Sequence, residues 1–114
     1  MAVIDDLREA AGGNGHPLHL AAGLYRRGRL VTIGVNGRNG KPFRRWYVNG
    51  EAFCSHAETA ALLSARRGDH LDVARFTLDG QVRMAKPCRR CEKKIRRLGV
   101  LCRYTDNDGC WRIL

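Results

Sequence analysis

Four residues of this chain have the types and spacing of a metal site that does chemistry: His56, Glu58, Cys88 and Cys91. Imidazole nitrogen and thiolate sulfur are ligands that zinc favours, and a site with three protein ligands keeps its fourth tetrahedral position open for water. Bound zinc lowers the pKa of that water from about 15.7 to near 7. Glu58 lies two residues after the histidine and offers a carboxylate that can accept and return a proton. The pattern therefore favours a catalytic centre over a closed structural one.

Helices and strands alternate along the chain in a way that would bring the two motifs together. We expect a helix that ends before Gly12-Gly13, a strand pair with its turn near Gly28, and a motif helix that Gly68 ends. The expected elements are a helix over 3–11, strands over 18–25 and 30–35, a long loop over 37–50, a helix over 56–67, a strand over 71–78, a helix over 88–98 and strands over 100–104 and 110–114.

This order predicts a single α/β domain over residues 1–114, with a five-stranded mixed sheet and helices packed on its faces. Residues 105–109 are too few for a crossover helix, so the last two strands should be antiparallel. Both motifs would stand at helix N-termini, where the helix dipole favours thiolate at Cys88 and Cys91.

The helix over 88–98 has two distinct faces. Cys88, Cys91, Ile95 and Leu98 recur at spacings of three and four, so they should face inward. Six cations cover the rest of this helix: Arg89, Arg90, Lys93, Lys94, Arg96 and Arg97. Clustered cations of this kind neutralise phosphates, although a solvated surface is an equal alternative.

Composition limits the protein to a few classes. The chain has 114 residues, 44% of them hydrophobic, and a net charge of +10. No apolar run approaches the roughly 20 residues of a membrane helix, so no membrane partner is expected. Five cysteines, an odd number that includes one C-x-x-C, favour metal binding in a reducing compartment. We expect a cytoplasmic or nuclear protein, with a domain of a secreted toxin or a viral protein as the alternative.

The pairing of His-Ala-Glu at 56–58 with Pro-Cys-Arg-Arg-Cys at 87–91 resembles the signature of the zinc-dependent nucleobase deaminases, the cytidine deaminase superfamily. The resemblance implies a three-layer α/β/α cytidine deaminase-like fold, Zn²⁺ as cofactor, and hydrolytic conversion of cytosine to uracil with release of ammonia. The implied roles are zinc ligation by His56, Cys88 and Cys91, and proton transfer by Glu58.

Two departures within the superfamily bear on the substrate. Free-nucleoside deaminases pair an asparagine at the end of the second strand with a glutamate two residues later, whereas here Asn36 is followed by Arg38. The histidine at position 56 resembles the ligand used by deoxycytidylate, tRNA-adenosine, AID/APOBEC-type and bacterial-toxin deaminases, whereas free-nucleoside deaminases usually have cysteine there. Together with an antiparallel terminal strand pair, it resembles the compact toxin-type or viral branch.

The leading interpretation is a deaminase of cytosine within single-stranded nucleic acid. Arg89, Arg90, Lys93 and Lys94 would contact the nucleic acid. The expected substrate-binding residues are Asn36, Trp46, Tyr47, Ala57 and Pro87, and the aromatic rings among them, like Tyr104 and Trp111, have faces on which a base can stack.

Other functions remain open from sequence alone. One is a deaminase of free cytidine, deoxycytidine or their monophosphates, and another is a catalytically silent zinc module that binds nucleic acid. A third possibility is a structural site of four thiolates: Cys88, Cys91, Cys102 and Cys110. Cys54, Cys102 and Cys110 are otherwise expected to be small buried or half-buried side chains. The oligomeric state is not predicted.

Overall fold

The computed structural model describes residues 3–12, 19–35, 45–48, 51–54 and 57–114, with only the backbone described at Gly12, 45–48 and 51–54. Three helices and eight strands occupy this part of the chain. In chain order they are α1 (Val3–Gly12), β1 (His19–Arg26), β2 (Arg29–Val35), β3 (Arg45–Val48), β4 (Glu51–Cys54), α2 (Ala57–Leu62), β5 (His70–Phe76), β6 (Val82–Arg83), α3 (Arg89–Leu98), β7 (Leu101–Thr105) and β8 (Trp111–Ile113).

The main sheet is mixed and its strands run in the order β2-β1-β5-β7-β8. The pairs β1–β2, β1–β5 and β7–β8 are antiparallel, and β5–β7 is parallel. The parallel pair is connected through β6 and α3, as a crossover connection requires. The prediction that the last two strands are antiparallel is confirmed.

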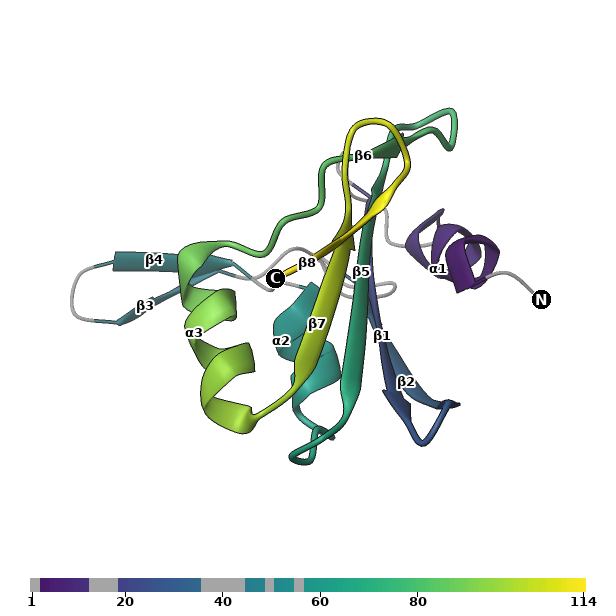
Figure 1. Cartoon of the computed structure of the whole chain (residues 1–114). Coiled ribbons are helices and arrows are strands. Elements are labelled where there is room, and N and C mark those ends of the chain that lie inside the picture. The colour runs from purple at the N-terminus through teal and green to yellow at the C-terminus, as the bar shows by residue number, and fades with distance from the viewer. Residues whose placement is uncertain (1–2, 13–18, 36–44, 49–50, 55–56) are drawn as a thin grey trace.

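Helices lie on both faces of this sheet (Figure 1). On one face, Leu7 and Ala11 of α1 pack against Ala74 and Phe76 of β5. On the other face, residues of α2 and α3 share a core with β1, β5 and β7, formed by Ala22, Leu24, Ala57, Ala61, Leu62, Leu71, Val73, Ala85, Ile95, Val100 and Cys102. The two motif helices are therefore neighbours above the same strands, while α1 supports the sheet from behind.

Three sequence expectations need correction. The sheet has six strands instead of five, because the two residues of β6 pair with the end of β5. The predicted loop over 37–50 contains β3, which pairs with β4 as a separate two-stranded sheet. The helix expected over 56–67 ends at Leu62. A strand of two residues, such as β6, is too short to show a periodic pattern in sequence. For β3, the glycines and the proline of the segment 37–50 favoured a loop, although its aromatic residues favour a strand.

A buried carboxylate explains why α2 is short. Asp69 is 3% exposed and accepts a hydrogen bond from the backbone N–H of Arg66 at 2.8 Å. It also accepts two hydrogen bonds from Arg26, at 3.0 and 2.8 Å. These bonds hold the chain after α2 in turns, and the helix cannot continue to Gly68 without breaking them.

Asp69→Asn is expected to lower the free energy of unfolding at neutral pH and to make that free energy fall less steeply as the solution is acidified. The hydrogen bond from Arg26 is the largest cause that lowers the pKa of Asp69 below its usual value of 3.8. Stability from this group is therefore full above the unfolded-state pKa and is lost as pH falls through the lower folded-state pKa. Urea unfolding of both proteins from neutral to acidic pH would measure this; the difference between them should shrink toward low pH. Asp5→Asn, which removes an exposed ion pair with Arg8, should have little effect.

No helix in the described ranges is long and apolar enough to cross a membrane.

Candidate active site

The two cysteines of the C-x-x-C occupy the start of α3. Cys88 is the N-cap residue and Cys91 lies in the first turn, where the helix begins with a bond from the Glu92 N–H to the Cys88 carbonyl at 2.8 Å. Cys88 is exposed, whereas Cys91 is 4% exposed. One thiol therefore faces the surface and the other faces the core, one helical turn apart.

Glu58 is the second residue of α2 and is 4% exposed. Its neighbour Thr59 places its hydroxyl oxygen 3.9 Å from the sulfur of Cys91. The beginnings of α2 and α3 therefore meet at Thr59 and Cys91, and the joining of the two motifs into one metal site stays a prediction. Burial of a carboxylate is costly unless the group is hydrogen-bonded or paired with a cation.

The electrostatics of this junction disfavour negative charge on the inner thiol. Burial is the main cause that raises the pKa of Cys91 far above its usual value, and the charges of Glu58 and Cys88 raise it further. Burial, then Glu58 and Asp72, also raise the pKa of Cys102 to about 12. From its position at a helix N-terminus alone, the Cys91 thiol was predicted to favour the thiolate form, which corresponds to a lowered pKa. A cation held between the thiols would reverse the balance, because it stabilises thiolate and offsets the repulsion from Glu58.

The donor chemistry at the junction fits zinc, for which two thiolates and one imidazole are suitable ligands. Within the described ranges, no three His, Cys, Asp or Glu side chains form a group that would hold a metal by themselves. His56, the third predicted ligand, lies outside those ranges, immediately before α2.

A glycine on β2 sets the position of α2. A Cβ atom at Gly34 would overlap the carbonyl oxygen of Ala57 and would lie 2.7 Å from the backbone nitrogen of Ala61. The helix backbone therefore rests directly on the strand. Ala57, one of the predicted substrate-binding residues, is fully buried at this contact.

Hydrogen bonds to β7 fix the approach to α3. The backbone N–H of Ala85 donates to the carbonyl of Thr105 at 2.8 Å, and the Thr105 hydroxyl donates to the carbonyl of Arg83 at 2.9 Å. Pro87, also predicted to bind substrate, is buried between this anchored segment and Cys88. The chain therefore enters α3 from a defined point on the sheet.

The remaining predicted substrate contacts are not located. Asn36 lies outside the described residues, and for Trp46 and Tyr47 only the backbone is described, in β3. The ring of Trp111 is covered by the Arg103 guanidinium at 4.4 Å, so that face of the indole is already occupied. Tyr104 is half-buried against the core below α2 and α3.

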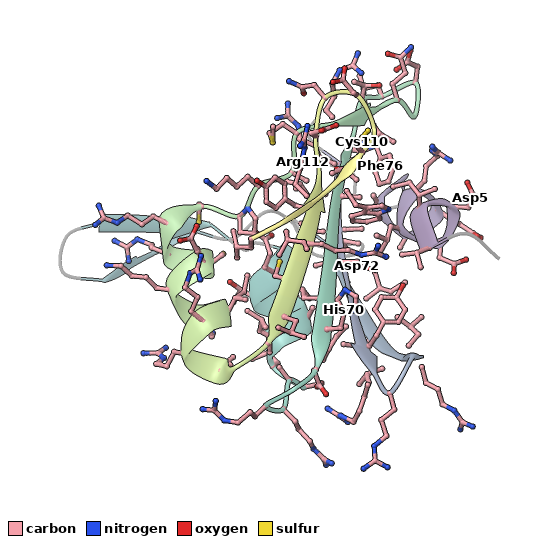
Figure 2. All side chains as sticks on the ribbon, in the orientation of Figure 1. Asp5, His70, Asp72, Phe76, Cys110 and Arg112 are labelled. Carbon is pink, nitrogen blue, oxygen red and sulfur yellow. The ribbon has the colours of Figure 1, made fainter. Side chains whose placement is uncertain are left out.

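The other cysteines do not join the site. Cys102 is 7% exposed and belongs to the core, as predicted. Cys110 is exposed, so its prediction as a buried side chain was wrong. Figure 2 shows it at the turn between β7 and β8, away from α3. All four cysteines of the alternative structural site are described, and no three of them gather, which rules that alternative out. The side chain of Cys54 lies outside the described part.

The outer face of α3 forms a hollow of about 740 Å³ lined only by cations: Arg89, Arg90, Lys93, Lys94 and Arg97. The acid of this helix, Glu92, is directed to Arg96, with 3.4 Å between Oε2 and Nε. Five of the six cations predicted to cover this helix therefore share one face, and Arg96 lines a different hollow. Contact of the cations with nucleic acid remains a prediction.

Sequence reasoning missed two residues of the site, Thr59 and Gly34. A glycine within a strand rich in β-branched residues is a sign of close backbone approach, so Gly34 carried a readable signal. Thr59 carried none, because its contact with Cys91 depends on how the two helices meet.

This mixed sheet with helices on both faces is an α/β fold, and thiols and a carboxylate lie where two helices begin on one of those faces. The crystal structure of a dCMP deaminase from the cyanophage S-TIM5, in apo form, matches 94% of this chain and 86% of its own, with a TM-score of 0.52 and 20% identity. At that identity the likeness is one of fold. The sequence matches no known family model, and no curated protein matches it either.

Proposed function

We propose that this protein is a zinc-dependent hydrolytic deaminase that converts cytosine to uracil and releases ammonia. The observation that carries this proposal is the buried carboxylate of Glu58, whose charge acts on the thiol of Cys91, in a fold shared with a dCMP deaminase. Hydrolysis at C4 of cytosine needs a group that removes a proton from water and delivers protons to the ring nitrogen and to the departing amine. Glu58 would make both transfers.

Cys88, Cys91 and His56 would hold the zinc ion. Bound there, the ion would supply a water of lowered pKa and stabilise negative charge as it develops. Cys91 and Glu58 are both withdrawn from solvent. A carboxylate in such surroundings exchanges protons with a bound substrate instead of with bulk water.

The proposed substrate is cytosine within single-stranded nucleic acid, because α3 has the two proposed thiol ligands at its start and five cations along its outer face. The second candidate is free dCMP. The activity named for the structural neighbour favours it, and a single phosphate would also suit a cationic surface. A silent zinc module is less well supported, because such a module has no need of a buried carboxylate at the metal.

A panel of substrates tests the proposal. The zinc-loaded protein is incubated with cytidine, deoxycytidine, their monophosphates, single-stranded and double-stranded DNA, and RNA. Ammonia release and C-to-U conversion are then measured, with chelator-treated protein as the control. We expect conversion in single strands that stops on zinc removal and returns on zinc addition. Turnover of dCMP alone would support the second candidate, and no turnover of any substrate would refute the deaminase.

A further inference from the structure

A second group of arginines lies beyond the far end of α3 from Cys88. It surrounds a hollow of about 480 Å³ formed by the turn after β1 and by the loop between α2 and β5. The lining residues are Arg26, Arg27, Arg66, Arg67, Gly68 and Asp69. The arginines form two pairs that are 40 residues apart in sequence, 26–27 and 66–67, so the fold alone brings the pairs together.

The charge of this hollow is positive after its internal ion pair is counted. Asp69 is the acid among the lining residues, and both of its oxygens are bonded to Arg26. Asp69 also accepts a hydrogen bond from the backbone N–H of Arg66, and the charge of Arg66 is among the causes that lower the pKa of Asp69. Arg27, Arg66 and Arg67 are all exposed, and four arginines against the single aspartate leave the lining with a net charge of +3.

The arginine hollow adjoins the end of α3. The backbone N–H of Gly68 donates to the carbonyl of Gly99, the residue that ends α3, at 2.9 Å. The Arg67 side chain lies against Gly99, because a Cβ atom on Gly99 would be 2.7 Å from the Nη1 atom of Arg67. The cationic face of α3 therefore continues past Gly99 into the arginine hollow, one helix length of about 15 Å from Cys88.

Stability explains only part of this arrangement. Arg67 sits where a cation interacts favourably with the negative end of the α3 dipole. Arg66 interacts favourably with Asp69, but neighbouring guanidinium groups also repel one another. A cluster of positive charge lowers stability through repulsion, but it also raises the local concentration of a polyanion.

We propose that the arginine hollow binds the phosphate backbone of a single-stranded nucleic acid that extends from the active site along α3. This inference rests on the proposed function for the identity of the base at Glu58. A free nucleotide carries its phosphate close to its base and cannot reach a site one helix length away. A strand of several nucleotides can occupy both the hollow on α3 and the arginine hollow.

Binding of DNA strands to the Glu58→Gln protein, which should not turn them over, tests the proposal. Fluorescence anisotropy compares a trinucleotide with a strand of about twelve nucleotides, each with one deoxycytidine, over a range of salt concentrations. We expect the longer strand to bind more tightly. Arg66→Gln and Arg67→Gln, each added to this protein, should each make the salt dependence of its binding shallower, by about 0.7 in the slope of log affinity against log salt.

The matched control is Arg112→Gln, which removes one exposed charge from β8, where the arginine is paired with Asp106 (Figure 2). It should leave the slope unchanged. Equal affinity for short and long strands, or the same slope for Arg66→Gln, Arg67→Gln and Arg112→Gln, would overturn the proposal. The wild-type protein is assayed in parallel for uracil formation. Binding that follows the prediction without any uracil would refute the deaminase and leave the strand site standing.

Discussion

Glu58→Gln is expected to abolish the proposed deamination while the protein keeps its fold and its affinity for the proposed zinc ion. The substitution preserves shape at a position that is 4% exposed, so packing between α2 and β2 should change little. It removes the group that would accept a proton from water and deliver protons to the substrate. Positioned acid–base groups contribute about 10²- to 10⁴-fold each, and here one residue serves both directions. We therefore expect activity to fall by at least that range, measured as ammonia release under saturating substrate.

The control for this experiment is Glu92→Gln, which makes the same chemical change on a half-buried glutamate of α3 that pairs with Arg96. It should retain most activity. Zinc content and thermal unfolding of both variants separate a loss of chemistry from a loss of structure. A Glu58→Gln protein as active as the parent would rule out the role proposed for this carboxylate, whatever its zinc content.

The sequence was sufficient for the parts of the site that depend on local order. Cys88 and Cys91 lie one turn apart because any helix that begins there places them so, and the cations of α3 share a face for the same reason. The antiparallel β7–β8 pair followed from the length of its turn. These features need no knowledge of distant residues.

What the sequence could not supply depends on distant contacts. The length of α2 is set by Asp69, whose partner Arg26 comes from another strand. The exposure of Cys110 follows from its place in the turn between β7 and β8. The arginine hollow joins residues of the β1–β2 turn with residues after α2, and only the pairing of β1 with β5 places them together. Propensity and periodicity describe single segments, so such long-range features appear only in the folded chain.

The connection between stability and catalysis is most direct at Gly34, where we expect Gly34→Ala to be both destabilising and inactivating. The added methyl group would overlap the Ala57 carbonyl and crowd the Ala61 nitrogen, and both are backbone atoms that cannot rotate away. Either β2 or α2 must move. Overpacking of this kind costs about 1–3 kcal/mol and more where backbone must shift. Because Glu58 follows Ala57 directly, a displaced helix also misplaces the carboxylate relative to Cys91.

Gly23→Ala is the matched control. Gly23 lies on the neighbouring strand, where it pairs with Ile33, the residue before Gly34. The added methyl group is the same, but it would point toward Leu7 of α1 instead of toward α2. There the nearest atoms belong to the side chains of Tyr25 and Leu7, at 3.0 and 3.2 Å, and side chains can adjust. Urea unfolding and deamination of both variants should show a larger loss of stability for Gly34→Ala, and loss of activity for that variant alone. If both variants lost activity in proportion to stability, α2 would have no special dependence on Gly34. A Gly34→Ala protein with full activity would show that the contact between β2 and α2 does not position Glu58.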